Sequence, residues 1–76
     1  MTDRATIRTR HDRPDVIAAA LSPDNTDEMS TRVDPEDGAV VTTIERETAG
    51  GLRTTADDYV ANLTVAQRIT DTTTQL

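Results

Sequence analysis

The sequence predicts a small α+β domain with the element order β-α-β-β-α. Three observations lead to this prediction. Three short segments alternate apolar and polar side chains with a period of two, and two other segments place apolar residues three and four positions apart. Turn-forming residues separate the five segments. The 76-residue chain has room for one domain, which we expect to span residues 1–70, with residues 71–76 as a frayed C-terminal tail.

The first half of the chain is predicted to form a strand followed by a helix. Residues 5–10 alternate in the manner of a half-buried strand. A helix is expected over residues 13–21, because Asp12 is a suitable N-cap and Pro14 is tolerated in a first helical turn. The helix should end at the turn-forming sequence of residues 23–25, Pro-Asp-Asn.

The second half is predicted to form a hairpin followed by a longer helix. Residues 29–33 and 39–47 alternate as strands on either side of a turn at residues 34–38. Gly50-Gly51 breaks this pattern, and a helix should follow over residues 52–69. Its apolar stripe consists of Leu52, Ala56, Tyr59, Val60, Leu63 and Ala66.

This element order limits the possible topologies. A right-handed crossover through the first helix makes the first two strands parallel and leaves a gap between them. The third strand fills the gap antiparallel to both, which gives a three-stranded antiparallel sheet of order 1-3-2. Both helices then cover one face, and the other face and two strand edges remain open to a partner.

The composition favours a protein stabilised by assembly. With no Cys and one His, the chain has no disulfide and is a poor candidate for structural zinc, so a homodimer is the expected means of completing a thin aliphatic core. Eight Arg, no Lys and fourteen acidic residues give a net charge of -6, which disfavours nonspecific nucleic-acid binding. The excess of Asp and Thr resembles proteins of halophilic archaea. The sequence contains no apolar run typical of a membrane span or signal peptide, and we expect a soluble, cytoplasmic protein.

No residue pattern predicts catalysis, a metal site or a cofactor. His11 has no nucleophile beside it in the sequence and is more simply an exposed imidazole. The acidic residues at 57–58, at 24 and at 27–28 are expected to be solvated rather than metal ligands. Gly50-Gly51 lacks the companions of a phosphate-binding motif and is read as a hinge. We therefore expect a protein that is not an enzyme.

Several arginines are expected on or near the open face of the sheet. Arg8, Arg10 and Arg32 could contact RNA phosphates within an assembly. The simpler alternative, which we favour, is that they pair with Glu45 and other carboxylates.

Nearly the whole chain resembles one known family. Residues 5–8 (Ala-Thr-Ile-Arg), residues 21–25 (Leu-Ser-Pro-Asp-Asn), the hairpin, and residues 51–59 at the start of the last helix are similar to the small dimerising subunit of the KEOPS complex, the Pcc/CTAG family. Relatives commonly have Asn at the position of Asp57. The resemblance implies a noncatalytic scaffold that forms a homodimer and docks the catalytic subunit, which makes threonylcarbamoyladenosine at position 37 of tRNA.

The resemblance also implies that the catalytic subunit packs against the two helices. The residues expected to contact it are Ile17, Leu21, Leu52, Arg53, Tyr59, Val60 and Leu63. Tyr59 and Leu63 are the sharpest expectations, against the alternative that the whole stripe is intramolecular core. A free-standing small RNA-binding domain is the alternative function, and a minimal enzyme is a distant third.

Overall fold

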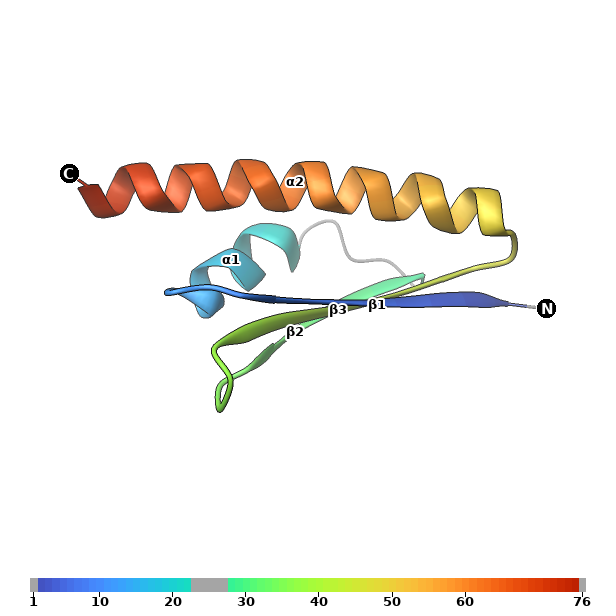
Figure 1. Cartoon of the computed structure of the whole chain (residues 1–76), viewed down its shortest axis with the longest axis horizontal. Helices are drawn as coiled ribbons and strands as arrows, with labels where there is room; N and C mark the ends of the chain where they lie inside the picture. Colours follow the sequence, from blue (N-terminus) through green and yellow to red (C-terminus); the bar gives the residue numbers. More distant parts are fainter. Residues whose placement is uncertain (1, 23–27, 76) are drawn as a thin grey trace.

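The computed structural model describes residues 2–22 and 28–75 and contains five elements in the predicted order (Figure 1). Their bounds are β1 (Asp3–Arg10), α1 (Pro14–Leu21), β2 (Met29–Asp34), β3 (Ala39–Arg46) and α2 (Ala49–Gln75). Strand β3 is central and pairs antiparallel with both neighbours, so the strand order is β1-β3-β2. The predicted α+β class and the order 1-3-2 are confirmed.

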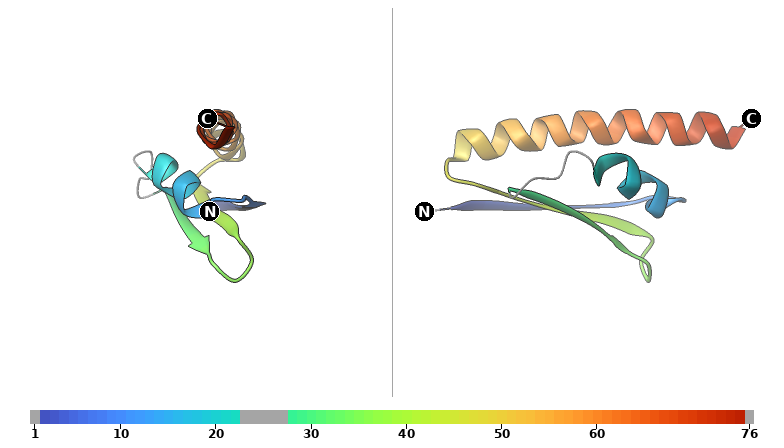
Figure 2. Two further views of the ribbon diagram at one scale, coloured as in Figure 1. Left: turned by 90° about the vertical axis from the view of Figure 1, so that its left-hand side faces the viewer. Right: turned by 180° about the vertical axis from the view of Figure 1, so that it is seen from behind.

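Both helices lie on one face of the sheet. The end-on view shows α1 and α2 side by side above the strands, and the opposite face has no described element over it (Figure 2). Strand β3 turns Val40, Thr42 and Ile44 toward the helices, and all three are fully buried. This arrangement follows from the period of two, because alternate side chains of a strand point to opposite faces.

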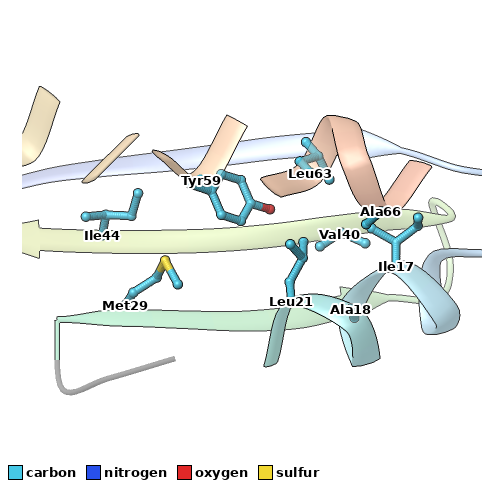
Figure 3. Close-up of a cluster of buried hydrophobic side chains, with 9 residues drawn as sticks. All are labelled: Ile17, Ala18, Leu21, Met29, Val40, Ile44, Tyr59, Leu63 and Ala66. Atoms are coloured by element: carbon cyan, nitrogen blue, oxygen red, sulfur yellow. The ribbon is translucent and has the colours of Figure 1, made fainter. Parts of the chain in front are cut away.

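The core joins α1, α2 and the helix-facing side of the hairpin (Figure 3). It consists of Ile17, Ala18, Leu21, Met29, Val40, Ile44, Tyr59, Leu63 and Ala66. Tyr59 supplies the largest of these side chains, and its hydroxyl oxygen accepts a 2.7 Å hydrogen bond from the buried hydroxyl of Thr42. Tyr59 is the only aromatic residue in this cluster, so aliphatic side chains fill the rest of the core volume. Each of them therefore contributes a large share of the free energy of unfolding.

Helix α1 begins at Pro14, and Arg13 rather than Asp12 is the N-cap residue. No side chain caps the helix, so the predicted cap at Asp12 is wrong. Proline has no backbone N–H, so one of the donors that a cap would satisfy is already absent. At the other end, the backbone N–H of Ser22 donates to Ala18. The turn expected at residues 23–25 lies outside the described residues.

Helix α2 is longer than predicted at both ends. It begins at Ala49, because the hydroxyl of Thr48 accepts a 3.0 Å hydrogen bond from the backbone N–H of Gly51 and so caps the first turn. It continues to Gln75, so the predicted end at Ile69 is wrong and residues 71–75, expected in a frayed tail, are helical. The side-chain amide of Gln67 donates to Asp71 at 2.7 Å, an i, i+4 contact that supports this extension.

Candidate functional site

Most of the residues predicted to contact a partner are buried within the chain. Ile17, Leu21, Tyr59 and Leu63 are at most 9% exposed and belong to the core cluster. Leu52 is half-buried and packs against the same cluster. Ile17, Tyr59 and Leu63 are therefore unavailable to a partner, and the alternative of an intramolecular core describes Tyr59 and Leu63.

Two predicted contact residues, Arg53 and Val60, do lie on the surface of α2. Val60 is 49% exposed, and Arg53 is also exposed. Because a helix turns about 100° per residue, Val60 lies beside the buried stripe rather than within it. The spacing of three and four in the sequence grouped Val60 with the core residues, although the structure separates it from them.

Helix α2 also carries an exposed apolar pair that the sequence pattern did not reveal. Val65 and Ile69 are 54% and 63% exposed, and their spacing of four residues places them on one side of the helix. They border a shallow groove of about 240 Å³ between α1 and α2. The groove is lined by Ala20, Leu21, Asn62, Val65, Ala66 and Ile69. The available signal was an apolar i, i+4 pair outside the main stripe.

The open face of the sheet carries a network of ion pairs. One guanidinium nitrogen of Arg8, Nη2, lies 2.6 Å from Asp34 and 2.7 Å from Asp37. Arg10 also approaches Asp37, at 3.2 Å, and Arg4 pairs with Glu45. Arg8 and Arg10 therefore pair with carboxylates, although their partners are Asp34 and Asp37 rather than Glu45.

The ion pairs also alter the acidity of the two aspartates. Hydrogen bonds from the Arg8 guanidinium lower the pKa of Asp34 and Asp37 below the ordinary value, and the charge of Arg10 lowers the pKa of Asp37 further. Both carboxylates accordingly stay ionised to more acidic pH than a free aspartate. The network links β1 to the end of β2 and to the turn that follows it.

Arg32 lies on β2, at the other edge of the open face from Arg8. Arg8 and Arg32 are the two register partners of Val41, which is only 4% exposed although it lies on the open face. The aliphatic stems of flanking arginines cover apolar neighbours in this way. Within residues 2–22 and 28–75, the Arg32 guanidinium has no ion pair.

His11 takes part in a chain of polar contacts that the sequence did not reveal. Its Nε2 lies 2.7 Å from the hydroxyl of Thr9, and its Nδ1 lies 2.5 Å from the side-chain oxygen of Gln67. Gln67 in turn donates to Asp71. The prediction of an exposed imidazole is therefore wrong, because His11 is half-buried and lies within hydrogen-bond distance of both Thr9 and Gln67.

This hydroxyl–imidazole chain lacks the features of a catalytic triad. Gln67 is neutral, so it does not stabilise an imidazolium as a carboxylate would. Thr9 is absent from the shallow hollow beside His11, which is lined by Arg10, His11, Asp12, Asp37, Gly38 and Gln67. The contacts instead join the end of β1 to α2.

The described residues contain no group of three or more His, Cys, Asp or Glu arranged to hold a metal ion. Asp57 and Asp58 are exposed on α2, whereas Asp24 and Asp27 lie outside the described residues. Neither described helix combines the length and apolar composition that crossing a membrane requires.

Comparisons of the chain with protein-family models, curated proteins and solved structures found no match.

Proposed function

We propose that this protein is a noncatalytic assembly subunit of the KEOPS type. In this proposal it forms a homodimer in the cytoplasm and docks the catalytic threonylcarbamoyltransferase subunit that modifies adenosine 37 of tRNA. The family resemblance of the sequence supplies the identity of the complex. The observation that supports docking is the exposed apolar groove between α1 and α2.

The groove has the properties expected of a helix-docking surface. Val65 and Ile69 expose branched aliphatic side chains, and Leu21 and Ala66 form the apolar floor between the helices. An amphipathic helix of a partner inserts its apolar ridge into a groove of this kind. This site replaces Tyr59 and Leu63 as the proposed contact.

A small RNA-binding domain is the alternative function, and the observation that favours it is the arginine-bearing open face. The ion pairs of Arg4, Arg8 and Arg10 offset most of that positive charge. The only Phe, Tyr or Trp side chain, Tyr59, is buried, so none of these rings is available to stack on a base. We therefore favour assembly over RNA binding.

Copurification from the native host with a tagged chain tests the assembly function. The wild-type chain should retain the catalytic subunit, and Ile69→Asp should lose it because a charge then enters the apolar groove. Thr64→Asp is the matched control, since it adds the same charge at an exposed position elsewhere on α2. Absence of the catalytic subunit from the wild-type preparation, or equal retention by Ile69→Asp, would contradict the proposal.

A further inference from the structure

Helix α2 carries one exposed apolar side chain, Val60, outside the groove between α1 and α2. The other two large exposed apolar side chains of the described residues, Val65 and Ile69, border that groove. Val60 is 49% exposed, and a turn of about 100° per residue places it on the opposite side of the helix from Ile69. This side of α2 therefore presents a second apolar surface.

Val60 lies beside β1. Gln67, whose side-chain oxygen lies 2.5 Å from Nδ1 of His11 at the end of β1, follows Val60 by about two helical turns and shares its face. Strand β1 and helix α2 run in the same direction (Figure 1). Val60 precedes Gln67 by about 10 Å along the helix, and Ile7 precedes His11 by about 13 Å along the strand. Val60 is therefore close to the level of Ile7.

Ile7, Ala56 and Val60 form an apolar ledge along the outer edge of β1, which we call the β1 ledge. Ile7 and Ala56 are half-buried, and both pack against the core cluster. Ala56 and Val60 are four residues apart and so lie on one side of α2. The core of the chain therefore continues to the edge of the sheet on this side, where Val60 is left exposed.

The backbone along this edge is open as well. In an antiparallel pair, residues that exchange hydrogen bonds alternate with residues that do not. The backbone N–H of His11 donates to Gly38 at 3.0 Å, which fixes this alternation along the β1–β3 register. The β1 residues whose N–H and C=O groups point away from β3 are Arg4, Thr6, Arg8 and Arg10. No described element lies beyond them, and β1 contains no proline, so this edge is a template for another strand (Figures 1 and 2).

The charges beside this edge are balanced within the chain. Each of the three β1 arginines is paired with a carboxylate of the same chain, and the three carboxylates belong to Glu45, Asp34 and Asp37. The whole chain has a net charge of -6, so most of its surface repels a second copy. An occupant of the β1 edge should therefore be neutral on the open face and apolar on the helix side.

Strand β1 of a second copy meets both requirements. Antiparallel pairing about a two-fold axis at Ile7 uses the outward backbone groups of both strands and sets Thr6 opposite Arg8 of the second copy. Ile7 then faces Ile7 of the second copy in a non-hydrogen-bonded pair, where the Cα atoms are about 4.5 Å apart and the side chains are closest. At the ends, Arg4 faces Arg10 of the second copy, and each keeps its own carboxylate. Pairing of like with like closes the assembly as a dimer.

We propose that two copies of this chain pair along their β1 edges, with Ile7 at the two-fold axis and the two β1 ledges packed against each other. The two three-stranded sheets then form one continuous sheet, and Val60 of each copy is covered. This inference rests on the homodimer of the proposed function and names the surface that forms it. The groove between α1 and α2 lies on the other side of α2 and stays open to the catalytic subunit.

Disulfide cross-linking of single-cysteine variants tests the position of the axis, because the 76-residue chain has no cysteine of its own. In molar salt with oxidised glutathione, Ile7→Cys should run mostly as a covalent dimer on a non-reducing gel. The reason is that Cα atoms about 4.5 Å apart lie within the range that a disulfide spans. Val65→Cys places an exposed cysteine on the groove side of α2 and should run as a monomer.

Two variants without cysteine test the strand edge and the ledge separately by sedimentation in molar salt. Thr6→Pro removes one outward N–H and no hydrogen bond to β3, so the fold should persist while the dimer dissociation constant rises about tenfold or more. Val60→Asp places a charge in the β1 ledge and should also raise the dissociation constant about tenfold or more. Ala61→Asp adds the same charge at the next, exposed position of α2 and should keep the wild-type value. Circular dichroism checks that each variant is folded.

The results that overturn the proposal differ from those that overturn the proposed function. A wild-type dimer whose dissociation constant is unchanged in folded Thr6→Pro and Val60→Asp would place the interface on another surface and leave the homodimer standing. Equal cross-linking of Val65→Cys and Ile7→Cys would also contradict pairing along β1. A folded wild-type monomer at micromolar concentration in molar salt would overturn both this proposal and the homodimer. None of these outcomes decides whether the catalytic subunit copurifies.

Discussion

Tyr59 illustrates why the sequence predicted a helix face correctly but assigned the wrong role to one of its residues. Helical spacing identifies an apolar stripe, and both a core and an interface produce the same stripe. Tyr59 is only 2% exposed, and its hydroxyl accepts a hydrogen bond from Thr42. Both observations place Tyr59 in the core rather than at an interface. Burial also raises the pKa of the Tyr59 hydroxyl, because the phenolate loses its hydration.

Replacement of Tyr59 should therefore reduce stability. Tyr59→Ala removes the only ring in the core and should lower the free energy of unfolding by about 3 to 5 kcal/mol. Tyr59→Phe keeps the ring and removes one hydroxyl, at a cost of about 1 kcal/mol. Urea unfolding of both variants measures the difference. Equal small losses for both would show that the ring is not a core group.

Arg8 provides a pH-dependent prediction at the residue scale. The pKa of Asp34 and Asp37 is lowered in the folded state, so their contribution to stability is present above the unfolded pKa of about 3.9 and is lost as the pH falls through the folded pKa. Arg8→Ala should therefore lower the melting temperature at pH 7. This difference in melting temperature from the wild type should shrink as the pH falls below about 4. Arg32→Ala, which removes an arginine without an ion pair among the described residues, is the control. If Arg8→Ala lowers the melting temperature as much at pH 2 as at pH 7, this account is contradicted.

At the scale of elements, the two glycines at the start of α2 differ in their surroundings. A Cβ added to Gly50 would meet nothing within 4 Å. A Cβ added to Gly51 would lie 3.0 Å from the hydroxyl of Thr48 and 3.3 Å from the guanidinium of Arg46. Gly51 therefore leaves room for the cap and for Arg46, whereas the sequence indicated only a hinge.

Alanine substitutions should distinguish the two glycines. Gly50→Ala should stabilise the protein by up to about 1 kcal/mol through helix propensity. Gly51→Ala has the same propensity gain but crowds Thr48, so it should be less stable than Gly50→Ala. Thermal unfolding of the two variants gives the comparison, and equal stabilisation would contradict the crowding at Gly51.

The strands and their order were predictable from sequence, whereas the ends of α2 and the groove were not. Along residues 39–47, successive side chains point to opposite faces of the sheet. The sequence of one segment is therefore enough to predict which residues face the helices. The end of α2 depends on polar contacts such as Gln67 with Asp71, which leave no apolar period. The groove requires α1 beside Val65 and Ile69, and this tertiary contact is invisible in either segment alone.

At the scale of the whole molecule, the net charge of -6 opposes self-association at low salt. The proposed homodimer should therefore have twice the chain mass by light scattering in molar salt, where the screening length is about 3 Å. Dilution into low salt should increase the monomer fraction. A folded monomer at micromolar concentration in molar salt would contradict the dimer.

The central claim is that this chain acts by docking a catalytic subunit through the α1–α2 groove while Tyr59 and Leu63 hold the fold. Titration calorimetry with the purified catalytic subunit, combined with thermal unfolding, tests it most directly in one pair of variants. Ile69→Ala should weaken binding by about 1 to 3 kcal/mol and leave the melting temperature nearly unchanged. Leu63→Ala should lower the melting temperature by several degrees, while its folded fraction binds as the wild type does. Wild-type affinity for Ile69→Ala would contradict the claim.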